Sequence, residues 1–120
     1  MIDVQMSEVF IYIRVRYCSC FVSQHIYKHD KNKELIESIG IGYFYNNFGA
    51  LIHCIIVTTK IEDKIYYKLY EINSTIYDNL FKNILLYKNY INENKLIKTI
   101  EYDIEEIKLK IKKRYERHTR

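Results

Sequence analysis

The chain has 120 residues, a formal net charge of +4 and a pI near 8.8, with 48% hydrophobic and 28% charged residues. These values fit one globular domain, residues 1–120, with a sizeable core, and they exclude wholesale disorder. The longest apolar runs, such as residues 55–57 and 84–86, are far shorter than the roughly 20 residues of a membrane span, so no membrane partner is expected.

The composition also bears on the origin and location of the protein. The chain contains 13 Tyr and no Pro or Trp, with an excess of Ile, Lys and Asn, which is typical of an AT-rich genome such as that of a virus, phage or other mobile element. Asp3 and Glu8 stand where a signal peptide carries cations. Three Cys without such a signal predict reduced thiols. We therefore expect a cytoplasmic protein, acting inside a cell that could be a host cell.

The first predicted elements are a strand and a short helix. Apolar and polar or aromatic residues alternate over residues 8–22, and this period of two predicts one long or bent strand. Asp30 then stands before residues 31–40 as a helix N-cap, and Gly40 occupies the place of a C-terminal cap. These signals predict a short helix after the first strand.

The middle of the chain predicts antiparallel strands. Residues 42–59 are rich in β-branched and aromatic side chains and contain a central Asn46–Asn47 turn signal, which predicts two strands. Residues 60–72 predict a further turn and strand by the same composition. The middle is therefore expected to be a meander.

Two helices are predicted to follow. Thr75 and Asp78 have the spacing of a capping box before an apolar stripe, which predicts a helix over about residues 76–91. After a break at residues 92–94, a second stripe with steps of three and four predicts a helix ending near His118. Its members are Ile97, Ile100, Ile104, Ile107, Ile111 and Tyr115. The predicted fold class is α+β, an antiparallel sheet of about four strands with the short helix and two C-terminal helices packed on it.

The last helix is the first candidate binding site. Its cations lie opposite the apolar stripe and form a ridge of Lys110, Lys113, Arg117 and Arg120, with Arg114 beside it. The ridge is either a set of phosphate contacts or a solvated helix end, since the helix macrodipole also favours cations near a C-terminus.

The predicted first strand provides the second candidate site. Phe10, Tyr12, Arg14 and Arg16 would project from one of its faces. Rings and guanidinium groups on one face can bind the bases and phosphates of a nucleic acid or nucleotide. The alternative is that the helices cover this face and the rings belong to the core.

Metal binding and catalysis are disfavoured. Cys18, Cys20, His25 and His29 are zinc-ligand types, but the two Cys lack the turn that brings thiolates together, so we expect no metal. We find no Gly-rich phosphate loop and no catalytic constellation, so we expect no cofactor, and the sequence favours a non-enzymatic protein over an enzyme.

Two functional hypotheses remain. The first is a small binding protein that binds a host protein or assembles with itself, most simply as a homodimer with the last helix at or beside the interface. The alternative is binding of nucleic acid or a nucleotide through the residues of the two candidate sites, which are Tyr12, Arg14, Arg16, Lys110, Lys113, Arg114, Arg117 and Arg120.

Overall fold

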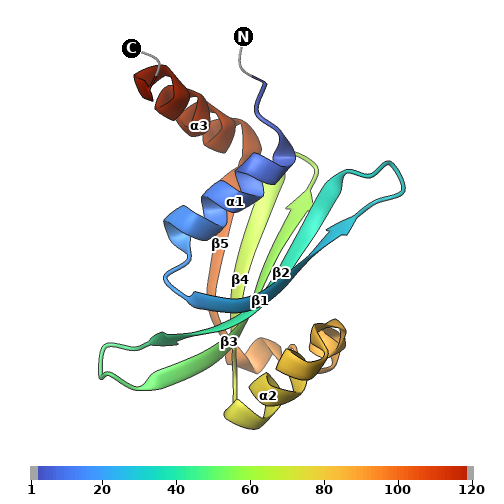
Figure 1. Ribbon diagram of the computed structural model, residues 1–120, viewed down its shortest axis with the longest axis vertical. Coiled ribbons are helices and arrows are strands. Elements are labelled where there is room, and N and C mark those ends of the chain that lie inside the picture. Colours follow the sequence, from blue (N-terminus) through green and yellow to red (C-terminus); the bar gives the residue numbers. More distant parts are fainter. Residues whose placement is uncertain (1–2, 119–120) are drawn as a thin grey trace.

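The computed structural model describes residues 3–118, and of the side chains it describes all but that of residue 118 within this range. The protein is an α+β fold built on one five-stranded antiparallel sheet (Figure 1). Its elements are α1 (Met6–Tyr17), β1 (Phe21–His29), β2 (Leu35–Tyr45), β3 (Leu51–Ile61), β4 (Lys64–Ile72), α2 (Ser74–Lys82), the 3₁₀-helices η1 (Ile84–Asn89) and η2 (Glu93–Lys95), β5 (Leu96–Asp103) and α3 (Ile104–His118). The predicted α+β class is thus confirmed.

The sheet is a simple meander in which the strands lie in chain order from β1 to β5. The predicted turn between β2 and β3 is present: the side-chain oxygen of Asn46 accepts hydrogen bonds from the backbone N–H groups of Phe48 and Ala50, both at 2.9 Å. Gly49 takes the left-handed conformation, with a φ of 78°, that closes this turn at no steric cost. Local turn chemistry therefore explains why the end of β2 and the start of β3 were predictable.

Helices cover the two faces of the sheet at opposite ends. One apolar cluster lies between the sheet and the pair α1 and α3 and includes Ile13, Cys54 and Ile107. A second cluster on the other face packs α2 and η1 against Ile55 and Tyr70. Figure 1 shows α1 and α3 together toward one end and α2 at the other. The region of α1 and α3 thus forms a separate surface from that of α2.

The strand predicted over residues 8–22 is wrong in its first two thirds, where helix α1 is found. Val9 and Ile13 are fully buried while Ile11 and Val15 are 46% and 70% exposed. An inward strand face would bury all four, whereas a helix buries positions four residues apart. Apolar residues occur at both odd and even positions of this segment, so the two-residue period of a strand and the 3.6-residue period of a helix fit it equally well.

The helix predicted over residues 31–40 is also wrong, because most of this segment belongs to strand β2. Asp30 caps a turn instead of a helix: its carboxylate accepts hydrogen bonds from the N–H groups of Asn32 and Glu34 at 2.8 and 3.0 Å. Lys33 has a φ of 63° in that turn. Gly40 is a strand residue and not a helix cap. These short-range signals belong to a tight connection between β1 and β2.

The helix predicted over residues 76–91 is divided into two shorter elements. Asn73, and not Thr75, caps α2 by accepting a hydrogen bond from the N–H of Ile76 at 2.8 Å. The α-helix ends at Lys82, and Asn83 then caps η1 through the N–H of Leu85 at 3.2 Å. A second capping residue, Asn83, lies within the apolar stripe, so the α-helix ends there and a 3₁₀-helix begins.

The last predicted helix begins later than expected, because the first part of its stripe is strand β5. Residues 96–103 pair with β4, which would otherwise expose an unpaired strand edge. Asp103 then caps α3 by accepting from the N–H of Glu105 at 2.9 Å. In the rest of the stripe Ile104, Ile107 and Ile111 are buried, whereas Tyr115 at its end is 39% exposed. No helix among the described residues is long and apolar enough to cross a membrane.

Candidate polyanion-binding cleft

A cleft of about 560 Å³ lies between α1 and α3, and most of the side chains around it are cationic. It is lined by Tyr12, Val15, Arg16, Lys110, Lys113, Arg114 and Arg117. Two of these positions in α1 and all four in α3 were candidate site residues from the sequence. The structure therefore brings both predicted sets together, although they are about a hundred residues apart in the chain.

Helix geometry accounts for this gathering. Residues 12, 15 and 16 are three and four positions apart, so they share one side of α1. Residues 110, 113, 114 and 117 share one side of α3 for the same reason. The buried residues, Ile13 on α1 and Ile107 on α3, lie on the neighbouring side of each helix, next to the cations. Burial of these inner faces fixes the direction in which the cations point.

Two of the cations are held against tyrosine rings. The Nζ of Lys110 donates a hydrogen bond to the hydroxyl of Tyr17 at 3.2 Å and lies 5.9 Å from the centre of its ring. The guanidinium of Arg114 lies 6.0 Å from the centre of the Tyr12 ring. The hydrogen bond to Tyr17 raises the pKa of Lys110, so this ammonium is charged throughout the physiological range. Both contacts keep positive charge at the cleft.

The tyrosines form a short aromatic series behind the cations. The ring of Tyr17 stacks on that of Tyr102 with centres 4.8 Å apart, and the Tyr12 ring meets Tyr17 edge-on at 6.1 Å. Tyr17 and Tyr102 were not predicted as site residues. Tyr17 is five residues from Tyr12 and one from Arg16, so it does not share their side of a helix and no local spacing identifies it.

The charges of the cleft are not neutralised by the ion pairs found among residues 3–118. Those pairs use Lys28, Lys64 and Lys108, and none of these lysines lines the cleft. Arg16, Lys113, Arg114 and Arg117 are exposed. The cleft is thus a cluster of hydrated cations whose charge is open to an anionic ligand.

Arg14 does not belong to this cleft, which corrects the prediction that it shares a face with Tyr12 and Arg16. Its guanidinium donates to the hydroxyl of Tyr27 on β1 at 3.2 Å. Burial, and then the charge of Arg14, lower the pKa of the neighbouring His25. Two residues along a helix turn a side chain by about 200°, so positions 12 and 14 face opposite ways. Arg120 lies outside the described residues.

The three cysteines lie close together on the sheet face under α1. The Sγ atoms of Cys54 and Cys20 lie 3.7 Å apart and share a hydrogen bond. A hydrogen bond to Cys20 and burial raise the pKa of Cys18. For Cys20, the hydrogen bond from Cys18 lowers the pKa, but the bond to Cys54 and burial outweigh it and raise the pKa to about 12. The thiols of Cys18 and Cys20 are therefore protonated and poorly nucleophilic at neutral pH.

Neither the cysteines nor the other candidate ligands form a metal site within residues 3–118. No group of three or more His, Cys, Asp or Glu side chains in this range is arranged to hold a metal ion. His25 and His29 both lie on β1 rather than one helical turn apart.

A second hollow of about 600 Å³ lies near the start of α2 and η2, at the other end of the sheet. Its lining includes Glu71 and Lys95, one side chain of each charge. The charged side chains of the α1–α3 cleft, by contrast, are all cationic, and this cleft is the stronger candidate for binding an anion.

Comparison of the chain with protein-family models, with curated proteins and with solved structures found no match.

Proposed function

We propose that the protein binds the phosphate backbone of a nucleic acid in the cleft between α1 and α3. The observation that carries this proposal is the convergence of five cations from two helices on one cleft, namely Arg16, Lys110, Lys113, Arg114 and Arg117. Lys and Arg are the side chains that neutralise phosphates and release their counterions. A non-enzymatic binding role of this kind needs no cofactor.

The aromatic contacts favour recognition of the backbone over recognition of bases. The ring of Tyr12 is already packed against Arg114, and the ring of Tyr17 against Tyr102. Rings with these partners have less free surface on which a base could stack. Phosphate contacts carry no direct sequence information, so we expect binding with little sequence preference.

The dimensions of α3 suit a chain of phosphates. Lys110 and Arg117 are seven residues apart, which is about 10.5 Å along the helix axis. Arg16 adds a cation from α1 across the cleft. A ligand with several phosphates in series can therefore contact more of these cations than a single phosphate can.

The alternative explanation is that the cations only complement helix macrodipoles. The macrodipole favours positive charge in the last turns of both α1 and α3. It does not require the two sets of cations to face the same cleft. The shared cleft thus supports a binding function beyond the preference of each helix.

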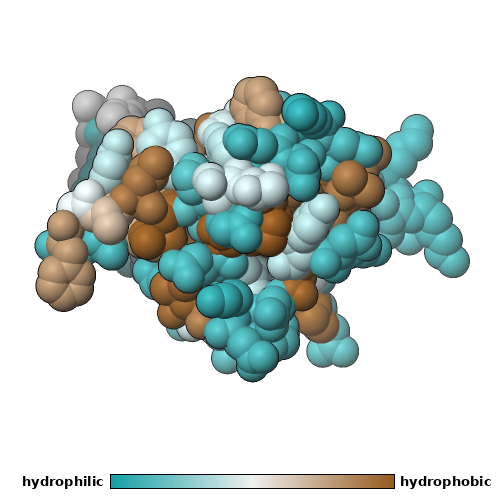
Figure 2. Space-filling view, turned by 90° about the horizontal axis from the view of Figure 1, so that it is seen from below, coloured by the Kyte–Doolittle hydropathy of each residue, from teal (hydrophilic) through white to brown (hydrophobic). Residues whose placement is uncertain are grey.

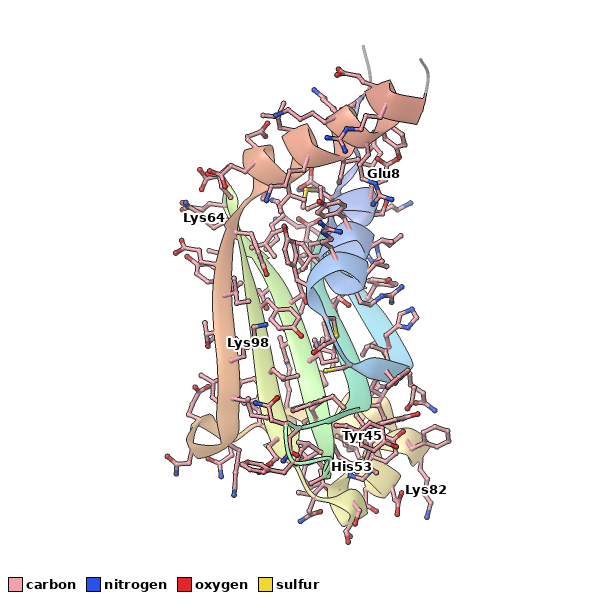
Figure 3. The ribbon with its side chains drawn as sticks, turned by 90° about the vertical axis from the view of Figure 1, so that its left-hand side faces the viewer. Glu8, Tyr45, His53, Lys64, Lys82 and Lys98 are labelled. Carbon is pink, nitrogen blue, oxygen red and sulfur yellow. The ribbon has the colours of Figure 1, made fainter. Side chains whose placement is uncertain are left out.

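A direct binding measurement tests the proposal. Fluorescence anisotropy of labelled random-sequence duplex DNA, single-stranded DNA and duplex RNA should show binding that weakens in Lys113→Gln/Arg117→Gln. The matched control, Lys31→Gln/Lys82→Gln, loses the same charge from exposed positions outside the cleft, and Lys82 lies at the far end of the molecule (Figure 3). Equal affinities of the two variants would contradict the proposal.

The sequence supports two broader proposals. Its excess of Ile, Lys, Asn and Tyr supports an origin in a virus, phage or other mobile element with an AT-rich genome. A nucleic-acid ligand would then be encountered inside the cell in which that element replicates. Titration with genomic fragments of different base composition tests the lack of sequence preference, because backbone binding predicts equal affinity for all of the fragments.

A further inference from the structure

An apolar groove of about 320 Å³ runs beside the basic cleft on the outer side of α1 and α3. It is lined by Glu8, Ile11, Tyr12, Val15, Ile111, Arg114 and Tyr115. Tyr12, Val15 and Arg114 line the cleft as well, so the two surfaces are continuous. The groove is therefore a neighbour of the proposed binding site but differs from it in chemistry.

Three of the residues that line the groove expose apolar surface to solvent. Ile11, Val15 and Tyr115 are 46%, 70% and 39% exposed. Ile11 and Val15 are four residues apart, so they form a stripe on the side of α1 that faces away from the core. Single exposed apolar residues are common in monomers, but a group of them around one hollow is typical of an interaction surface.

The groove also carries one charge of each sign. Glu8 belongs to α1, and it lies in the part of α1 nearest to α3 (Figure 3). Its Oε2 is buried, and among the described residues it has no hydrogen-bond partner. Arg114 belongs to α3 and lies over the Tyr12 ring. A surface with an apolar centre, an acid on one helix and a base on the other is complementary to itself.

This self-complementarity identifies the occupant, and we propose that the groove binds a second copy of this chain. In a twofold arrangement, Ile11 and Val15 of each copy pack into the groove of the other, and Glu8 of each copy approaches Arg114 of its partner. Twofold pairing is the commonest closed arrangement of soluble proteins. The inference does not rest on nucleic-acid binding, because it is tested on the protein alone.

Other exposed apolar residues are weaker candidates. Phe81, Leu85 and Leu86 are exposed on α2 and η1. Figure 2, which views the molecule from below in Figure 1, shows apolar side chains separated by hydrophilic ones. The hollow at this end is lined by Glu71 and Lys95, but Phe81, Leu85 and Leu86 do not line it, so these exposed apolar residues and the hollow are not combined there as they are at the α1–α3 groove.

Pairing through the groove would place two basic clefts beside each other. The shared residues Tyr12, Val15 and Arg114 make each cleft border the interface. Two adjacent clefts repel each other in the free protein and share one ligand in the bound protein. Because α1 has 12 residues and is about 18 Å long, the contact is small, and we expect a micromolar rather than a nanomolar dimer.

Sedimentation velocity over micromolar to millimolar concentrations tests the pairing. The unmodified protein should shift from monomer to dimer, and Val15→Glu should remain a monomer, because it places a charge at the centre of each groove. Leu85→Glu, which changes a residue of similar exposure on η1, should dimerise like the unmodified protein. Far-ultraviolet circular dichroism and the thermal midpoint show that each variant is folded.

A charge exchange tests the predicted contact itself. Arg114→Glu alone should weaken association by about tenfold or more, and combining it with Glu8→Arg should restore association. If Glu8→Arg does not fold, the weakening by Arg114→Glu remains a required result. A monomer at all concentrations, a Val15→Glu variant that dimerises normally, or loss of the dimer in Leu85→Glu instead would each overturn the inference.

Discussion

Removal of three cations from α3 should reduce both the affinity for nucleic acid and its dependence on salt. The variant Lys110→Gln/Lys113→Gln/Arg117→Gln leaves two of the five cations that line the cleft. Each neutralised phosphate contributes about 0.9 to the slope of log affinity against log salt on duplex DNA. Five contacts predict a slope of about −4.5, and two contacts predict about −1.8.

These slopes give a measurable difference. Between about 50 and 200 mM salt, the unmodified protein should lose about 500-fold in affinity for duplex DNA, and the variant only about 12-fold. Fluorescence anisotropy at both salt concentrations measures each ratio. The fold should survive, because all three side chains are exposed and the buried stripe of α3 is untouched.

The matched control for this variant is Lys31→Gln/Lys82→Gln/Lys112→Gln. It removes the same charge, and Lys112 lies on α3 but does not line the cleft. This control should keep nearly the full slope, because general attraction contributes less than direct phosphate contacts. Equal slopes for the unmodified protein and the cleft variant would refute the reasoning, and so would an equal reduction in the control.

Three further predictions concern the fold. Gly42→Ala should lower the free energy of unfolding, measured by urea denaturation, by about 1–3 kcal/mol or more, because the added Cβ would lie 2.2 Å from a backbone oxygen of β1. Gly40→Ala should be tolerated, because the nearest atom to its added Cβ is 3.4 Å away, and similar losses in the two variants would contradict this prediction. Ile13→Ala should lower the free energy of unfolding by about 2–5 kcal/mol, because Ile13 is fully buried. Val15→Ala should hardly change it, because Val15 is 70% exposed, and equal losses in the two variants would favour a strand over helix α1. The hydrogen bond to Cys54 and burial raise the pKa of Cys20 from 9.0 to about 12, so the folded state favours the protonated thiol. The thermal midpoint should therefore fall as the pH rises from 9 toward 12, because the unfolded state loses this proton first. A midpoint that stays constant over this window would contradict the buried thiol cluster.

Strands β3 and β4 and the end of β2 next to Asn46 could be predicted from the sequence because their information is local. Asn46 supplies the turn between β2 and β3 with its own side chain, and the flanking residues are β-branched and aromatic. Helix α1 and strand β5 carry no such local signal. Residues 8–17 and 96–103 have apolar residues that fit a helix or a strand, and only the buried contacts of α1 and the pairing of β5 with β4 decide between them.

The candidate site was predictable to a similar extent. The α3 half follows from helical spacing, which the sequence indicates correctly over residues 104–117. In the α1 half, Tyr12 and Arg16 were identified under the assumption of a strand, which also included Arg14. The helix turns Arg14 toward Tyr27 and brings Tyr17 behind the cations instead. That both halves meet at one cleft depends on long-range packing that no local pattern contains.

Chemical-shift mapping tests most directly whether the α1–α3 cleft binds nucleic acid. Random-sequence duplex DNA is titrated into the ¹⁵N-labelled protein at low salt, and the amide shifts are followed along the chain. The account predicts that shifts concentrate in residues 12–17 and 110–117, that they disappear at high salt, and that α2 and η1 remain unaffected. Shifts concentrated on α2 or η1, or no shifts in either cleft helix, would contradict it.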